Sequence, residues 1–367
     1  MMNFSERHVI TSRQLMYLLC IATFPTEVML LPHPMITQFG KDALWAIAIA
    51  SIYTVGPLLL SFEIVHRSKG RSLAHVLNAH GGLFGRLVLI LFGLAILVPT
   101  INLWGGYVQL LHTALLARTP PWAILAVALA VVLYGVTGGL EVVGRLAELF
   151  VPVGIATIIG MWLLGLPWYN VGRLMPIWPQ HPAVFTTGAY YVFTFLAEVV
   201  FGSYLGAFAR DHEGVRRAMV LALVINTALL LMATAMPLLM FSVEHASMLT
   251  VPPLTAVRTI HFGFIIERLD TLIMSAWVIF VSLKLILWGL LAAEMIADAL
   301  GVRAYALIGQ ISLSLTALFS LRLHSLGEVE ASVVAIWYFL SFPAILLSVV
   351  SAAVTCRLRP RKKAIHA

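Results

Sequence analysis

The sequence predicts an all-α integral membrane protein with ten transmembrane helices. Of its 367 residues, 61% are apolar and only 11% are charged, whereas a typical soluble domain has about 45–50% apolar and about 25% charged residues. A single core in water could not bury so much apolar surface. The apolar stretches lack the period-two alternation of barrel strands, and lipid tolerates only helices and closed barrels as spanning structures. The bilayer is therefore the solvent, and the fold is helical.

Ten apolar segments come close to the length of about 20 helical residues that a hydrocarbon core requires. The fourth and the ninth are the shortest. No small-residue cleavage site follows a short apolar core near the start, so we expect the first segment to remain as a membrane helix and not to be removed as a signal peptide. Together the segments predict one transmembrane domain over 1–367, with spans at 12–36, 43–65, 87–116, 121–136, 146–166, 184–209, 218–241, 272–293, 305–321 and 331–355.

The basic residues predict the orientation of these spans. If the N-terminus is cytoplasmic, 16 of the 23 Lys and Arg residues fall in cytoplasmic segments, six fall in outer segments, and Lys284 lies within a span. Short cytoplasmic loops carry such an excess of basic residues. We therefore expect both termini to be cytoplasmic, with residues 356–367 forming a basic cytoplasmic tail. The net charge of +7 then reflects membrane topology, and nucleic-acid binding is not expected.

Three ionisable residues fall near the middle of predicted spans. Glu27, Glu198 and Lys284 each lie roughly 18 to 23 Å along their spans, at a rise of about 1.5 Å per residue. A charge at this depth is costly, so the default interpretation is a functional site in which each group has a partner. A structural ion pair, or a neutralised group that faces the bundle interior, is the alternative. Pro25 and Glu27 in neighbouring turns further predict a break in the first helix, of the kind that transporters use to present backbone dipoles to a substrate.

Other motifs that could carry chemistry are weak. Asn102 and Ser282 could line a cavity, although such side chains also join membrane helices through hydrogen bonds. The two cysteines, Cys20 and Cys356, lie at opposite ends of the chain, and the 12 histidines show no metal-ligand spacing. No nucleophile, base and orienting residue form a recognisable arrangement. The sequence therefore predicts no catalytic residue, no metal and no cofactor, and an enzyme is not expected.

Ten spans divide into two sets of five. Because five is odd, the second set begins on the opposite side of the membrane, so the sets at about 12–166 and 184–355 could be inverted repeats. The first and sixth spans then correspond, and each carries a glutamate near mid-membrane, Glu27 and Glu198. This correspondence favours a pocket formed by the two helices.

Four groups of residues, in order and at similar spacing, are typical of one bacterial family. They are Arg118-Thr119-Pro120, Gly138-Gly139-Leu140-Glu141 followed by Arg145, Phe195-Leu196 with Glu198-Val199, and Ile266-Glu267-Arg268-Leu269 with Trp277. With them the chain, from its first to its tenth span, resembles the B subunit of spore germinant receptors. The resemblance implies the amino acid, polyamine and organocation transporter superfamily and the leucine-transporter type of fold, with broken helices 1 and 6. It also implies a ligand pocket between spans one, three, six and eight, and A and C subunits as partners in the inner spore membrane.

Two positions depart from the pattern of that family. Its first span usually has a glycine pair where this chain has Pro25 and Glu27, and its eighth span commonly has two threonines where this chain has Leu283 and Lys284. Glycine amides suit a free carboxylate ligand, whereas a glutamate repels one. We hypothesise that Lys284 is a tethered cation in place of a bound ion, with Glu27 or Glu198 as its partner.

The predicted function is a non-enzymatic germinant sensor that binds a small amino acid or amine in a midplane pocket. A proton-coupled secondary amino acid transporter is the alternative, and an assembly subunit with a vestigial pocket is the third hypothesis. Lys284, Glu27 and Glu198 are the candidates for ion or proton coupling. The candidate ligand-binding residues are Thr23, Phe24, Pro25, Thr26, Glu27, Asn102, Phe195, Leu196, Ala197, Glu198, Phe201 and Ser282.

Overall fold

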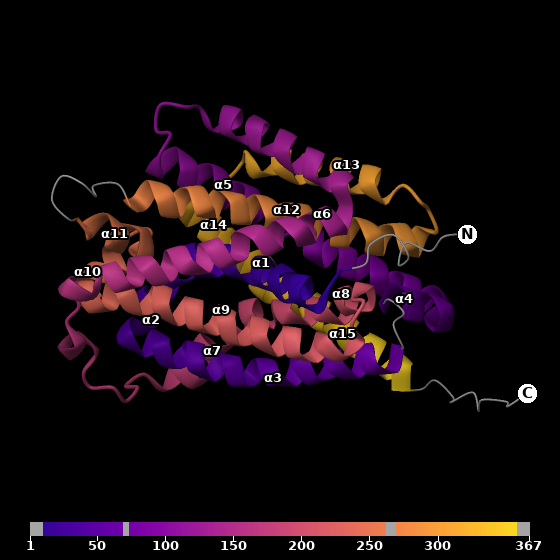
Figure 1. Ribbon diagram of the computed structural model, residues 1–367, viewed down its shortest axis with the longest axis horizontal. Helices are drawn as coiled ribbons and strands as arrows, with labels where there is room; N and C mark the ends of the chain where they lie inside the picture. Colours follow the sequence, from indigo (N-terminus) through magenta and orange to yellow (C-terminus); the bar gives the residue numbers. More distant parts are fainter. Residues whose placement is uncertain (1–9, 69–72, 262–268, 358–367) are drawn as a thin grey trace, which may run out of the picture.

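The computed structural model describes residues 10–68, 73–261 and 269–357. Helices form nearly all regular structure in this part of the chain, and its only extended pairing is an isolated parallel bridge between Ile10 and Ala209. Figure 1 shows the long helices side by side along the longest axis of the molecule. The predicted all-α fold is therefore confirmed for the described residues. The tail residues 358–367 and the motif residues 266–268 lie outside them.

The described elements range from single turns to a helix of 44 residues. In chain order they are α1 (Ser12–Leu30), α2 (Pro32–Phe39), η2 (Gly40–Asp42), α3 (Ala43–Ser68), α4 (Leu73–Leu97), α5 (Thr100–Ala114), α6 (Pro121–Leu164), η3 (Leu166–Trp168), η4 (Val171–Leu174), η5 (Pro182–Phe185), α7 (Thr187–Leu196), η6 (Ala197–Phe201), α8 (Gly202–Leu205), η7 (Gly206–Phe208), α9 (His212–Met240), α10 (Val243–Met248), α11 (Pro252–Thr259), α12 (Leu269–Leu300), α13 (Tyr305–Ser320), α14 (Leu326–Val333), η8 (Val334–Ser341) and α15 (Phe342–Arg357).

The bundle has two ends, which we call near and far. At the near end α1 begins, α3 ends, α9 begins and α15 ends, and at the far end α2, α10 and α11 lie together (Figure 1). Contacts between distant parts of the sequence close the near end. The amide of Ile10 donates to the carbonyl of Phe208 over 3.0 Å, and the guanidinium of Arg357 at the end of α15 pairs with the carboxylate of Glu63 on α3. The described chain therefore begins and ends on the same side of the bundle.

Seven stretches of the described chain are long and apolar enough to cross a membrane. One of the seven, α6, contains both the fourth and the fifth predicted spans. The first predicted span falls mainly in α1, and the ninth falls in the shorter apolar helix α13. The count of ten spans and the inverted repeat stay predictions. The seven stretches are Pro32–Ser68, Gly81–Ala114, Pro121–Leu164, Pro182–Phe208, Glu213–Met240, Leu269–Leu300 and Leu326–Arg357.

A proline divides the third predicted span, and a glycine separates the fourth from the fifth. Gly139, with φ 69° and ψ −174°, interrupts α6, and a side chain would strain this backbone conformation. Figure 1 shows the two halves of α6 running in opposite directions from this point. The predicted third span at 87–116 overlaps the single apolar stretch Gly81–Ala114 but consists of two helices, because α4 ends at Leu97 and Pro99 precedes the first residue of α5. Proline cannot donate the backbone hydrogen bond that would continue α4.

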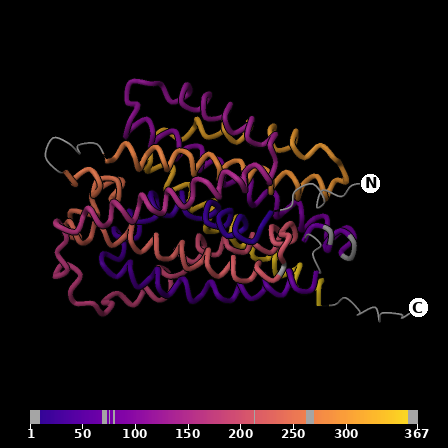
Figure 2. Tube along the Cα trace, in the orientation of Figure 1, coloured from indigo at the N-terminus to yellow at the C-terminus, as the bar shows by residue number. Residues whose placement is uncertain are grey.

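The predicted break of the first helix at Pro25 is wrong. Residues Ser12–Leu30 form one α-helix with Pro25 inside it. Proline has a helical φ, but it lacks the amide hydrogen bond and its ring crowds the carbonyl four residues earlier. Membrane helices tolerate this disturbance when neighbouring helices pack against them. Neighbours are present, since α1 packs against α6, α9 and α12. In Figure 2 the indigo trace of α1 passes through the middle of the bundle.

The sixth predicted span does change its helical form. The α-helical turns of α7 end at Leu196, and the chain continues as the 3-10 helix η6 before the short helix α8. A 3-10 turn is tighter than an α-helical one and directs side chains differently. Glu198 lies within this 3-10 segment, so the change of helix form sets the direction of its carboxylate.

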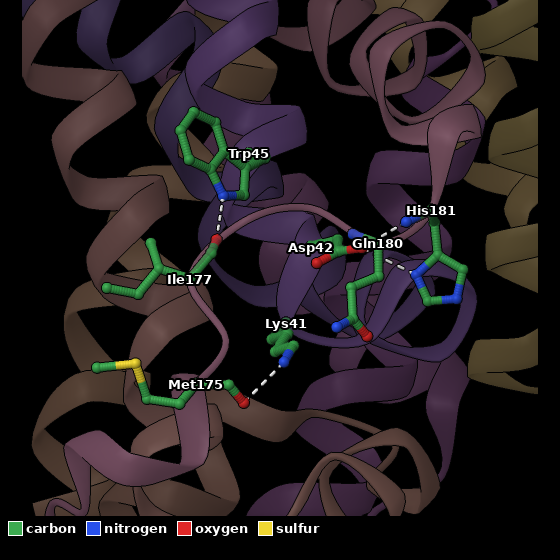
Figure 3. A network of polar contacts seen from close by, with 7 residues as sticks. All are labelled: Lys41, Asp42, Trp45, Met175, Ile177, Gln180 and His181. Atoms are coloured by element: carbon green, nitrogen blue, oxygen red, sulfur yellow. Dashed lines mark hydrogen bonds and ion pairs between the residues drawn. The ribbon is translucent and has the colours of Figure 1, made fainter.

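One connection at the far end is fastened to the start of α3. Residues 165–186, which we call the far-end strap, link α6 to α7 (Figure 1). Side chains of η2 and α3 bind its backbone (Figure 3). The contacts are Lys41 Nζ to the Met175 carbonyl at 2.7 Å, Trp45 Nε1 to the Ile177 carbonyl at 2.6 Å, and the Asp42 carboxylate with the amides of Gln180 and His181 at 2.7 and 2.9 Å and with Nδ1 of His181 at 2.9 Å.

Candidate functional site

A buried ion pair lies at the centre of the bundle. Nζ of Lys284 on α12 is 3.1 and 3.3 Å from the two carboxylate oxygens of Glu198, and 1% and 2% of the two side chains are exposed. The same ammonium donates to Oγ1 of Thr26 on α1 over 2.8 Å. It also lies 4.5 Å from the ring centre of Trp288, within the range of a cation–π contact. Lys284 thus joins α1, η6 and α12 through one charged group.

In such a pair, the burial of each charge is stabilised by the other charge. Taking a charge out of water costs several kcal/mol, and a partner with further hydrogen bonds offsets that cost. Thr26 provides one such hydrogen bond to Lys284. Removing one member of a buried pair typically costs about 3–5 kcal/mol, because the other charge is left alone. Of the two partners considered for Lys284, the structure pairs it with Glu198.

Glu27 has a different environment. It is 1% exposed, and neither carboxylate oxygen has a hydrogen-bond partner among the described residues. The buried hydroxyl of Thr23, one turn earlier, also lacks a partner there. Glu27 nevertheless lies within electrostatic range of Glu198 and Lys284. The cluster around Lys284 therefore holds one ammonium and two carboxyl groups, and among the described residues only the Glu198 carboxylate is paired.

A cavity of about 140 Å³ opens toward the far end beside this cluster. Its walls come from the end of α1, from α2, α7 and α14, and from the connection between α10 and α11. Thr26 lines the cavity and also binds Lys284, so it connects the cavity with the ion pair. The lining residues that matter below are Thr26, Leu30, His33, Phe195, Val329 and Glu330.

The other predicted ligand residues do not line this cavity, so a midplane pocket formed by the whole predicted set stays a prediction. Only Thr26 and Phe195 of the predicted set line it. Phe24 instead lines a cavity of only about 10 Å³ between α1, α6 and α12. The carbonyl of Pro25 accepts a hydrogen bond from the indole of Trp277 over 2.7 Å. Because the helix is continuous here, these side chains point to different neighbours around it and not into one gap.

The remaining predicted residues are engaged in packing. Asn102 Oδ1 accepts a hydrogen bond from Ser332 Oγ over 2.7 Å, which links α5 to α14. The hydroxyl of Ser282 donates to the carbonyl of Val278 in its own helix. Such polar contacts between and within membrane helices are a structural use of these side chains. Leu196, Ala197 and Phe201 are buried in the core.

Sequence reasoning missed two ionisable residues in the cavity wall. His33 on α2 and Glu330 on α14 are 3.7 Å apart, from Nε2 to Oε2. Both lie near the ends of predicted spans, where a charged side chain ordinarily reaches the interface. A weak signal was present, since Glu330 directly precedes the predicted tenth span.

The fold is that of a class of secondary transporters. Mhp1, a nucleobase-cation-symport-1 family transporter solved with bromovinylhydantoin bound, matches with a TM-score of 0.65 and 15% identity, covering 97% of this chain and 93% of that one. A manganese transporter from Eremococcus coleocola matches with a TM-score of 0.60 and 14% identity, covering 95% and 76%. At these identities the likeness shows the fold alone, which is the leucine-transporter type.

The family is established by sequence. The profile of the spore germination protein family matches residues 9–329, and the chain belongs to that family. It is 28% identical over 170 residues to spore germination protein YndE of Bacillus subtilis (strain 168). That alignment spans about half of each protein, 45% of this chain and 46% of the relative. The expected family is thereby confirmed: the protein is a multi-pass membrane protein of a permease family and not an enzyme.

Proposed function

We propose that this chain is the germinant-sensing membrane subunit of a spore germination receptor. It binds a small amino acid or amine in the far-end cavity that Thr26 and Phe195 line. One observation carries the proposal: Thr26 contacts both the cavity and the Lys284 ammonium. A ligand that engages Thr26 therefore acts on the ion pair that holds α1, η6 and α12 together.

The proposed signal is a change in the packing of these three elements. If the ligand takes the Thr26 hydroxyl as its own partner, Lys284 loses one of its hydrogen bonds, and the balance between two arrangements of the bundle shifts. A ligand can shift such a balance only by binding one arrangement more tightly. Receptor A and C subunits in the inner spore membrane read the shift in this proposal, and the basic near end of the bundle faces the cytoplasm.

The test is a Thr26→Val substitution, which keeps the shape of the side chain and removes its oxygen. We expect spores carrying it to lose the response to their nutrient while the protein level stays normal. Thr355→Val is the matched control. The Thr26 hydroxyl donates to the carbonyl of Thr23, three residues earlier in its helix, and the Thr355 hydroxyl likewise donates to the carbonyl of Ser351, four residues earlier, at the near end of α15. An unchanged response of the Thr26→Val spores would contradict the proposal. Loss of the response in spores that lack the protein, together with an unchanged response of the Thr26→Val spores, would point to an assembly role with a vestigial pocket.

A proton-coupled transporter is the second candidate, and Glu27 favours it. The buried cluster of Lys284, Glu27 and Glu198 is neutral only when one of its two carboxyl groups holds a proton, and isolated buried charges are costly. Glu198 is paired, so the proton belongs on Glu27, the group without a partner. Proteoliposomes separate the two candidates. Uptake of the nutrient driven by a pH gradient, and abolished by Glu27→Gln, supports transport, whereas binding without accumulation supports the sensor.

A further inference from the structure

The cavity wall contains an ion pair that is loosely made. His33 Nε2 and Glu330 Oε2 are 3.7 Å apart, beyond the usual length of an N–H···O hydrogen bond. Neither side chain has another polar partner among the described residues, and Nδ1 of His33 is buried without one. The two side chains are 25% and 35% exposed. The two side chains are thus partly exposed, line the cavity and make only one long contact with each other.

The rest of the wall around this pair is mainly apolar. Leu30, Leu31, Phe195, Val329 and Val333 line the cavity together with His33 and Glu330, and the hydroxyl-bearing side chains in the lining are those of Thr26, Tyr191 and Thr250. Its volume of about 140 Å³ is below the about 300–1,000 Å³ that is typical of pockets for drug-sized ligands. The occupant is therefore small, with an apolar part for this wall and charged groups for the pair.

We propose that His33 and Glu330 together recognise the zwitterionic head of an α-amino acid with a small aliphatic side chain. The ammonium of the amino acid binds the Glu330 carboxylate, and its carboxylate accepts a hydrogen bond from Nε2–H of His33. Entry of the ligand between the two side chains replaces one long contact with two charge-assisted ones. This inference rests on the proposed function and names the ligand class of its cavity.

A ligand with a single charge fits the pair less well. An amine would engage Glu330 but leave His33 without its carboxylate partner, and a carboxylic acid would engage His33 while repelling Glu330. Leaving a desolvated polar group without a partner is costly. The geometry therefore favours an amino acid over an amine, a choice that the sequence leaves open.

The test compares three compounds of similar shape on the purified full-length protein by isothermal titration calorimetry. L-valine has both charged groups, isobutylamine lacks the carboxylate, and isovalerate lacks the ammonium. We expect valine to bind at least tenfold more tightly than either of the others. This comparison uses the unaltered protein, so it does not depend on the folding of any variant.

Substitutions then identify the residues. Glu330→Gln and His33→Gln should each weaken valine binding at least tenfold with an unchanged melting temperature of the unliganded protein. Glu328→Gln is the matched control, because this carboxylate on the same helix accepts the backbone amide of His324 and does not line the cavity. Equal binding of valine and isobutylamine, or unchanged affinity in Glu330→Gln, would overturn the inference.

The failure of this inference can be distinguished from that of the proposed function. If valine and other small amino acids do not bind, but Thr26→Val abolishes a germination response to a sugar or a nucleoside, the ligand class is wrong and the sensor proposal stands. If Thr26→Val leaves every response intact while valine binds as described, the sensor proposal fails and the binding site remains.

Discussion

The ammonium of Lys284 and the carboxylate of Glu198 form an ion pair across 3.1 Å in the middle of the bundle. The two residues are 86 positions apart in the sequence and come from α12 and η6. Thr26 of α1 completes the group through its hydroxyl. Three elements therefore meet at one charge, which explains why substitutions here should affect stability and signalling together.

Lys284→Met should lower the free energy of unfolding by about 3–5 kcal/mol, because Glu198 is left as a lone buried charge. Adding Glu198→Gln should recover most of that loss, whereas adding Glu27→Gln should not. Equilibrium unfolding of the detergent-purified variants, followed by circular dichroism, measures these differences. A Lys284→Met protein that is as stable as the unaltered one would contradict this prediction, because breaking the ion pair would then cost no free energy of unfolding.

Glu27→Gln should be tolerated, with a change in the free energy of unfolding below about 1 kcal/mol. Glutamine has the shape of a protonated glutamate, the form that charge neutrality favours at this position. Glu198→Gln is the comparison and should cost about 3–5 kcal/mol, since it leaves Lys284 alone. Equal losses in the two variants would mean that both carboxylates share the ammonium. The same unfolding experiment measures both.

The far-end strap should loosen when Asp42 loses its charge. Asp42 is 2% exposed, and its carboxylate accepts the amides of Gln180 and His181. Hydrogen bonds to a charged group contribute about 1.5–3 kcal/mol and neutral ones about 0.5–1.5 kcal/mol, so Asp42→Asn should cost about 1–2 kcal/mol. Limited proteolysis should then cut residues 165–186 several times faster. Glu244→Gln, an exposed carboxylate at the same end, should leave that rate unchanged.

The two ends of the bundle should lie on opposite sides of the membrane. Val171→Cys in the far-end strap should react with an impermeant thiol reagent in sealed cells, because Val171 is 65% exposed. Ala304→Cys, between α12 and α13 at the near end, should react only after the cells are opened. The native Cys20 and Cys356 are buried and provide the background. Labelling of Ala304→Cys in sealed cells would reverse the predicted orientation.

The depth of a residue along an apolar segment could be predicted from the sequence. The direction in which its side chain points around the helix axis could not. Glu27, Glu198 and Lys284 all stood out because a charge in an apolar run of known rise has a calculable depth. Which glutamate faces Lys284 depends on helix rotation and on the 3-10 turns of η6, and both arise from packing. The break expected at Pro25 failed for the same reason, since neighbouring helices support α1 there.

The sequence by itself determined that the chain is a helical membrane protein of the spore germination family, because apolar composition and motif order are properties of the chain alone. Only the tertiary structure decided where the cavity lies and what lines it. His33 and Glu330 are 297 positions apart, and each looks like an ordinary interfacial residue in its own segment. They meet because the bundle brings α2 and α14 to the wall of one cavity, and such long-range proximity is set by the whole bundle and not by any local pattern.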